Sequence, residues 1–146
     1  MKVNFSKVNE YLVKIFNDVL IVEEHELKKS QFNDLTIKEM HTIDTIGLSR
    51  LKTSSEVAHE LSVTKGTLSV SINNLVKKNY VERVRSELDR RVVYLRLTKR
   101  GKLLYRLHDR FHREMVETIM DGLNETEQRA ITKGLENLHH FLGELK

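Results

Sequence analysis

The sequence contains no cysteine and no proline, and only 6 of its 146 residues are glycine. Without cysteine, neither a disulfide framework nor thiolate chemistry is available. No apolar run approaches the ~18 residues that a membrane span needs. Charged residues such as Lys7, Lys14 and Asp18 interrupt the apolar core that an N-terminal secretory signal requires. We therefore expect a soluble, cytoplasmic protein that forms a single unit over residues 1–146.

The sequence also lacks the motifs of common enzyme classes. It contains no Gly-rich phosphate loop, no nucleophile elbow and no zinc-protease motif. Lys65-Gly66-Thr67 is similar to the end of a phosphate-binding loop, but the upstream glycine and strand of such a loop are missing. We therefore expect neither an enzyme nor a bound cofactor.

Positive charge is concentrated in one segment of the chain. The net charge is only +4, yet between Lys77 and Arg113 there are 13 Lys and Arg against 4 Asp and Glu. The remainder of the chain is therefore net negative. A run of charge is often no more than a solvated surface, but its concentration in a single segment favours a polyanionic partner such as nucleic acid.

Apolar residues recur at helical spacing over most of the chain. In the first expected helix, Val8, Leu12, Ile15, Val19 and Val22 are separated by steps of four and three residues. Three further helices are expected to begin at capping boxes, in which a Thr or Asn precedes a Glu by three positions. These N-terminal residues are Thr36, Thr53 and Asn124. The expected helices span residues 5–28, 36–47, 54–61, 64–78, 99–121 and 125–145.

Between Val81 and Leu97 the apolar period changes to two. Two short runs rich in β-branched residues flank a charged turn at 87–90, which is typical of a β-hairpin. Two helices joined by a tight turn at Ser62-Val63 precede this hairpin. The order predicts a mainly α fold with a small β-hairpin, a winged helix-turn-helix whose DNA-binding region covers residues 35–98.

The helix expected over 64–78 has two different faces. Leu68, Ile72, Leu75 and Val76 share one face, which we expect to pack inward. The outward residues are small or hydrogen-bonding and include no acid, as a helix in the DNA major groove requires. A solvated helix, the alternative, would carry more Glu and Lys. The expected DNA-binding residues on this helix are Thr64, Lys65, Thr67, Ser69, Ser71, Asn73, Asn74 and Lys77.

The hairpin turn is the second expected DNA contact. Arginine suits the negative potential of a narrow minor groove. Asp89 looks out of place there, and we expect it to pair with Arg91 and hold the turn, which leaves Arg90 to contact DNA. A turn that is merely solvated is the alternative. The expected DNA-binding residues of the turn are Arg85, Asp89, Arg90 and Arg91.

The wing and the residues behind it resemble the MarR family of bacterial transcription regulators. The resemblance rests on Asp89-Arg90-Arg91, followed by Leu97-Thr98 and Gly101, and covers the whole chain. The stretches 37–44, 82–86 and 108–112 are similar to the repressors of fatty-acid synthesis within that family. This resemblance implies repression of genes for fatty-acid chain elongation, with long-chain acyl-acyl carrier protein as the corepressor.

The resemblance also implies a homodimer held by the helices at 5–28, 99–121 and 125–145. The apolar stripes of the first and last helices support this independently, because one small winged domain cannot cover them. A symmetric pair would place two recognition helices about one DNA turn apart, ~34 Å, on a palindromic operator.

An acyl carrier protein is acidic and delivers a long apolar tail, so its site requires a basic surface beside an apolar tunnel. The expected basic surface consists of Arg106, Arg110 and Arg113. The expected tunnel is lined by Phe16, Val19, Leu20, Met40, Ile43, Leu104, Leu107, Phe111 and Met115. The alternative is that these apolar residues are only dimer core and the arginines only solvated charge.

Metal sensing is the rival function. His108 and His112 are four residues apart, a spacing that lets two imidazoles share a metal ion. Together with His41, they resemble the zinc-responsive regulators of the same family, and Glu24, His25 or Glu39 would have to complete the set. Those regulators often add thiolate ligands, which this chain lacks. A non-specific architectural DNA-binding protein is a third alternative.

Overall fold

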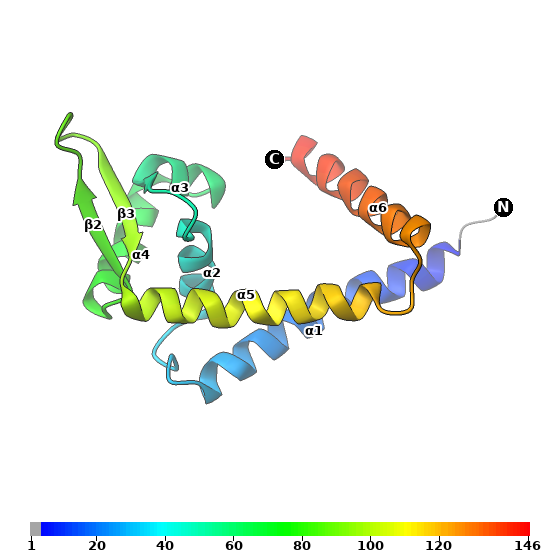
Figure 1. Ribbon diagram of the computed structural model, residues 1–146. Helices are drawn as coiled ribbons and strands as arrows, with labels where there is room; N and C mark the ends of the chain where they lie inside the picture. Colours follow the sequence, from blue (N-terminus) through cyan, green and yellow to red (C-terminus); the bar gives the residue numbers. More distant parts are fainter. Residues whose placement is uncertain (1–3) are drawn as a thin grey trace. The chain divides into compact units, whose positions relative to one another are not determined.

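Six helices and three short strands make up residues 4–146, the part of the chain that the computed structural model describes (Figure 1). In chain order they are α1 (Phe5–Lys29), α2 (Ile37–Ile46), β1 (Lys52–Thr53), α3 (Ser54–Glu60), α4 (Lys65–Lys77), β2 (Val81–Arg85), β3 (Val93–Leu97), α5 (Lys99–Met120) and α6 (Glu125–Glu144). The mainly α fold with a β-hairpin is therefore confirmed. Where we expected a single unit, the chain divides into two compact units, Met1–His108 and Asp109–Lys146.

The expected helix starts are present. Thr36, Thr53 and Asn124 each accept a hydrogen bond from the backbone N–H of the Glu three residues later, and that Glu accepts one from the cap N–H in return. Thr64 caps α4 by accepting from Thr67 N at 3.1 Å. These reciprocal bonds satisfy backbone donors that a helix start otherwise leaves unpaired.

The sheet has one more strand than the sequence predicts. Its order is β1-β3-β2, and both pairings are antiparallel. β1 is only two residues long, so it has no detectable period of its own. In Figure 1 the β2–β3 hairpin projects beyond the ends of the helices around it.

A single apolar core holds the first unit together. It contains residues from the α1–α2 region, the helix-turn-helix, the hairpin and the start of α5. Tyr80, between α4 and β2, is fully buried, and Leu75 and Val57 are as well. The helix-turn-helix is thus fixed from both sides, by α2 and by the sheet.

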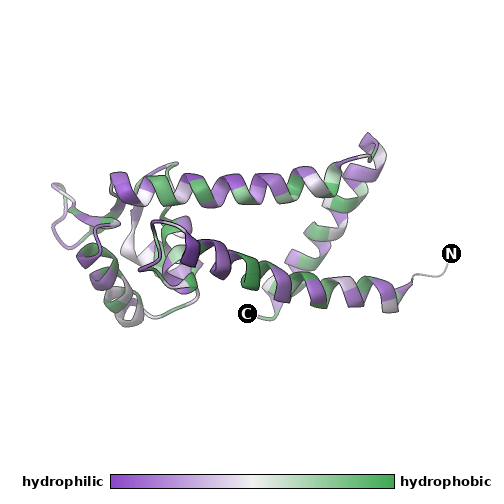
Figure 2. Cartoon of the chain, turned by 90° about the horizontal axis from the view of Figure 1, so that it is seen from below, coloured by the Kyte–Doolittle hydropathy of each residue, from purple (hydrophilic) through white to green (hydrophobic). Residues whose placement is uncertain are grey.

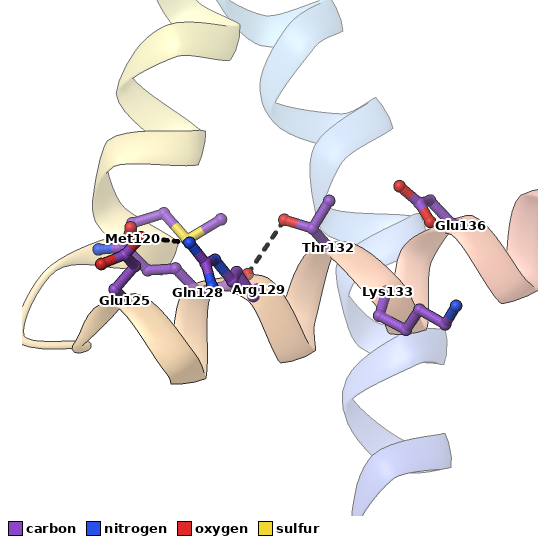
Figure 3. Close-up of a pocket in the computed structure, with 7 residues that line it drawn as sticks. All are labelled: Met120, Glu125, Gln128, Arg129, Thr132, Lys133 and Glu136. Carbon is purple, nitrogen blue, oxygen red and sulfur yellow. Dashed lines mark hydrogen bonds and ion pairs between the residues drawn. The ribbon is translucent and has the colours of Figure 1, made fainter.

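The second unit consists of the end of α5 and all of α6. No residue of α6 is buried, although the helix has a clear apolar side. An open pocket of about 450 Å³ lies at the turn between these helices. Figure 3 shows the side chains that line it: Met120, Glu125, Gln128, Arg129, Thr132, Lys133 and Glu136. None of these residues belongs to the expected acyl tunnel. Within residues 4–146, no helix is long and apolar enough to cross a membrane.

Candidate nucleic-acid interface

Helix α4 has the two faces that the sequence predicts. Leu68, Ile72 and Leu75 are buried in the core of the first unit. Val76 was expected to join them, but it is 38% exposed, so that expectation is wrong. The reason is angular: Val76 follows Leu75 by about 100° around the helix axis, which takes it out of the inward stripe.

The outward face of α4 is polar and free of acid. All eight residues expected to contact DNA on and beside this helix are exposed except Ser71, which is half-buried. The Thr64 hydroxyl donates to Thr67 Oγ1 at 2.9 Å, while it also accepts from Thr67 N. Because the Thr67 hydroxyl is the acceptor in this bond, it can still donate a hydrogen bond to a partner outside the helix.

The C-terminal end of α4 is held by a polar cluster around the buried side chain of Tyr80. The Tyr80 hydroxyl donates to Asp34 Oδ1 at 2.6 Å, and Arg100 Nη1 donates to the Lys78 carbonyl at 2.6 Å. The Arg100 guanidinium also lies 4.2 Å from the centroid of the Tyr80 ring. Burial and the Asp34 carboxylate raise the pKa of Tyr80 well above its usual range, so its hydroxyl stays a donor. Lys78 Nζ donates to both carboxylate oxygens of Glu39, at 2.9 and 3.2 Å.

The wing turn is closed by its own side chains. Asp89 Oδ1 accepts from Arg91 N at 3.0 Å and from Arg91 Nε at 3.1 Å, so the expected Asp89–Arg91 pair is confirmed. Arg85 Nη1 donates to the Arg90 carbonyl at 2.8 Å. The Arg90 side chain is exposed at the tip of the hairpin. The turn thus uses Asp89 and Arg91 for closure and leaves the Arg90 guanidinium available to a partner.

The Asp89 carboxylate is held in its charged form. The hydrogen bonds from Arg91 lower the pKa of Asp89 below its ordinary value. A carboxyl group with a lowered pKa in the folded state stabilises that state above its unfolded-state pKa. This contribution to the turn is lost only as the pH falls through the lowered pKa.

Arg83 is the residue at this surface that sequence reasoning missed. It lies on β2 and donates through Nη2 to Asn73 Oδ1 on α4 at 2.7 Å. Alternation along the strand gave no reason to select it, because the contact depends on how the hairpin packs on the helix. The only signal in the sequence was the presence of an arginine ten residues after Asn73 on the expected recognition helix.

Comparisons with known proteins agree with this geometry. The chain is 56% identical to FabT of Streptococcus pneumoniae in a crystal structure with DNA, with a TM-score of 0.89 over 98% of this chain and 100% of that one. The chain belongs to the MarR family of transcriptional regulators. A family model described as transcriptional regulator SarA/Rot also matches residues 20–106.

More distant similarities were found in sequence and in fold. The HTH-type transcriptional regulator PchR of Bacillus subtilis is 23% identical over 141 residues, which cover 94% of this chain and 80% of PchR. A MarR protein from Peptoclostridium difficile is 20% identical, with a TM-score of 0.72 over 97% of this chain and 92% of that one, which shows a likeness of fold. These relatives are transcription regulators and not enzymes, in agreement with the expectation for this chain.

The residues that we expected to line an acyl tunnel lie in different environments. Met40, Ile43 and Leu104 are at most 4% exposed and pack in the core of the first unit. Phe16 and Leu20 on α1 are at least half exposed. The remaining expected residues range from half-buried to exposed: Val19, Leu107, Phe111 and Met115. The tunnel stays a prediction.

The arginines of the expected basic surface are exposed on α5. Arg113 Nε donates to Asp109 Oδ2 at 2.8 Å, and Arg110 Nε lies 3.6 Å from Glu114 Oε1. Each of these is an ion pair within one helix. Arg106 is exposed as well. Exposed pairs of this kind contribute only about 0–1 kcal/mol and are readily exchanged for other partners.

Two of the three histidines expected to bind a metal, His41 and His108, lie close to each other. In the first unit, the rings of His41 and His108 lie 6.1 Å apart, and His41 Nε2 is 3.0 Å from Glu23 Oε2. His112 follows His108 by one turn of α5. The acidic neighbour is Glu23, where the sequence suggested Glu24, His25 or Glu39. Glu39 instead caps α2 and pairs with Lys78.

Proposed function

We propose that this protein is a homodimeric repressor that binds a palindromic operator in a sequence-specific manner. The observation that supports this most is that one unit carries two suitable features. The exposed face of α4 contains no acidic residue, and the closed wing turn leaves the Arg90 side chain available. The 56% identity to a FabT protein crystallised with DNA points the same way. In such a complex α4 would enter the major groove, and Arg90 would reach the flanking minor groove.

The dimer is supported by apolar side chains that the isolated chain leaves in water. Phe5 is 77% exposed, and Phe16 on the same helix is 62% exposed. On α6, Phe141 is 55% exposed, and Leu145, which caps the end of that helix, is 69% exposed. In Figure 2 apolar bands recur between polar ones along the helix that begins at the N mark. So many large apolar side chains exposed on one helix mark an interaction site, and a second copy would cover those of α1 and of α6 symmetrically.

The direct test is a binding titration with the full-length protein. A palindromic duplex selected from a random pool should bind as one dimer per site, and scrambling one half-site should weaken binding by at least about tenfold. Sedimentation of the free protein should give twice the mass of the chain. Equal affinity for the palindrome and its scrambled control would overturn specific recognition and favour an architectural role.

We further propose that the regulated genes are those of fatty-acid synthesis, and that long-chain acyl-acyl carrier protein is the corepressor. The support is the resemblance to fatty-acid repressors in three stretches of the sequence, together with the exposed arginines of α5. An acidic carrier could exchange the intrahelical pairs of Arg110 and Arg113 for its own carboxylates at little cost. The acyl chain would require apolar side chains to move apart, for which the flexible Met40 and Met115 are suited.

Acylated and unacylated carrier distinguish this proposal. The long-chain acyl form should raise operator affinity, whereas the unacylated carrier should do so far less. Arg110→Glu should abolish the carrier effect and leave basal DNA binding unchanged. Arg129→Glu is the matched control, because Arg129 on α6 is also exposed and paired within its helix, with Glu125 at 2.5 Å. Equal loss of the carrier effect in both variants would contradict a specific docking role for Arg110.

A divalent metal is the second candidate effector. The observation that favours it is the approach of His41, His108 and the buried Glu23 in the first unit, because imidazole and carboxylate are common zinc ligands. The same titration separates the two effectors. Release from the operator by a chelator, with no response to acylated carrier, would replace the acyl proposal by metal sensing.

A further inference from the structure

Arg83 connects the wing to the recognition helix. Its pair in the sheet register is Leu95, which is 1% exposed. Residues directly opposite in an antiparallel pair point to the same face, so Arg83 leaves the sheet on the side that packs against the helices. From there Nη2 reaches Asn73 Oδ1 at 2.7 Å and lies 3.5 Å from the Ser69 carbonyl.

This contact fixes the orientation of the Asn73 amide. A guanidinium group can only donate hydrogen bonds, so the amide atom that faces it must be the oxygen. The amide nitrogen then lies on the other side of the planar group. Asn73 is exposed, and within residues 4–146 its amide nitrogen donates to no acceptor. Both hydrogens on that nitrogen are available to a partner outside the protein.

We infer that Arg83 is a positioning residue that turns the Asn73 oxygen toward the hairpin, so that Asn73 presents its amide donors to the edge of a base. An unrestrained Asn pairs with adenine through both groups, because it donates to N7 and accepts from N6. Arg83 occupies one of the two lone pairs of the Asn73 oxygen and turns that oxygen toward the hairpin, so the amide nitrogen is the group that faces outward. In this orientation Asn73 matches a base with adjacent acceptors. Guanine offers N7 and O6 side by side in the major groove. We therefore expect position 73 to favour guanine over adenine.

This inference rests on the proposed function, since it requires α4 to lie in the major groove. It assigns a role to a residue outside the helix that touches the base. Removal of the Arg83 side chain should release the Asn73 oxygen and let it accept from adenine. The base preference at that position should then change, whereas a merely structural brace would alter stability and leave the preference as it is.

The test is a selection of preferred half-sites from a random duplex pool, carried out with full-length variants. Arg83→Met should lower the guanine-to-adenine ratio at one position of each half-site by about tenfold. Arg83→Lys, which keeps the charge and one donor, should give an intermediate ratio. Arg96→Met is the matched control: Arg96 is an exposed arginine of the same hairpin that pairs with Glu82 at 2.6 Å. It removes the same charge and should leave every base preference unchanged.

A double variant tests whether Arg83 acts through Asn73. In an Asn73→Ala background, Arg83→Met should change no base preference. A further change in that background would mean that Arg83 reads DNA on its own and would overturn the inference. So would a guanine-to-adenine ratio in Arg83→Met equal to that of the wild type. If the wild-type protein enriches no sequence at all, the proposed function fails instead, so the two failures are distinguishable.

Discussion

Gly101 provides the sharpest test of how the first unit is packed. It lies in the first turn of α5, where a Cβ atom would be 2.2 Å from the Tyr80 carbonyl oxygen and 3.3 Å from Leu97 Cβ. The Tyr80 oxygen cannot withdraw freely, because it accepts a hydrogen bond from Thr98 N at 2.9 Å. Gly101→Ala must therefore displace either α5 or the segment that ends α4.

One stabilising and two destabilising effects decide the sign of this substitution. Alanine is favoured over glycine within a helix by about 1 kcal/mol. Overpacking of a core typically costs about 1–3 kcal/mol, and the obstacle here is backbone, so the upper end applies. Disruption of the hydrogen bond between Thr98 and Tyr80 adds about 1 kcal/mol. We expect the free energy of unfolding to fall by about 2–3 kcal/mol, and the thermal midpoint by about 5–10 °C.

The assay is thermal or urea unfolding at fixed protein concentration, because the stability of an oligomer depends on concentration. Gly134→Ala is the control, since Gly134 lies inside α6 and a Cβ there meets nothing within 4 Å. That variant should gain about 0.5–1 kcal/mol. A thermal midpoint of Gly101→Ala at or above the wild-type value would refute the close approach of α5 to Tyr80.

The remaining predictions concern DNA binding. Arg90→Ala should weaken operator binding by about 1–3 kcal/mol. Asp89→Ala should also weaken it, because the turn opens, and tighter binding in a gel-shift titration would contradict the structural role of this carboxylate. Asn74→Ala should reduce the ratio of operator affinity to random-sequence affinity. Lys77→Ala should weaken both affinities alike and flatten the salt dependence by about one unit for each phosphate that the lysine neutralises. Identical responses of the two variants across a salt series would count against this division of roles. A Cβ atom at Gly66 would meet no atom of the protein within 4 Å, so Gly66→Ala should raise the thermal midpoint slightly. Its operator affinity should fall, and an unchanged affinity would argue against a close approach of α4 to the DNA groove.

The features that could be predicted from the sequence are local ones. Thr36, Thr53 and Asn124 begin helices because each cap and its Glu partner are three residues apart. The pair formed by Asp89 and Arg91 needs only two residues of separation. Such interactions depend on backbone geometry that the neighbouring residues themselves determine, so charge type and spacing are sufficient.

The interactions that could not be predicted depend on packing between distant segments. Tyr80 reaches Asp34, 46 residues away, and Glu23 reaches His41, 18 residues away. No periodicity of either segment encodes which side chains will face each other. The expectation that Val76 would be buried failed for a different reason. An apolar residue at the edge of a helix's apolar stripe can face either the core or the solvent.

The packing of the first unit limits how an effector can act. The cluster of Tyr80, Asp34 and Arg100 fixes the end of α4, and Arg83 ties the same helix to the wing. A close-packed core with satisfied polar groups resists continuous deformation, so α4 itself is a poor target for reshaping by an effector. The exposed apolar sides of α1 and α6 are the surfaces that a dimer would use, and their packing would set the spacing of two recognition helices. An effector that favours the spacing of the operator must bind more tightly when the operator is present, because the coupling between the two sites is reciprocal.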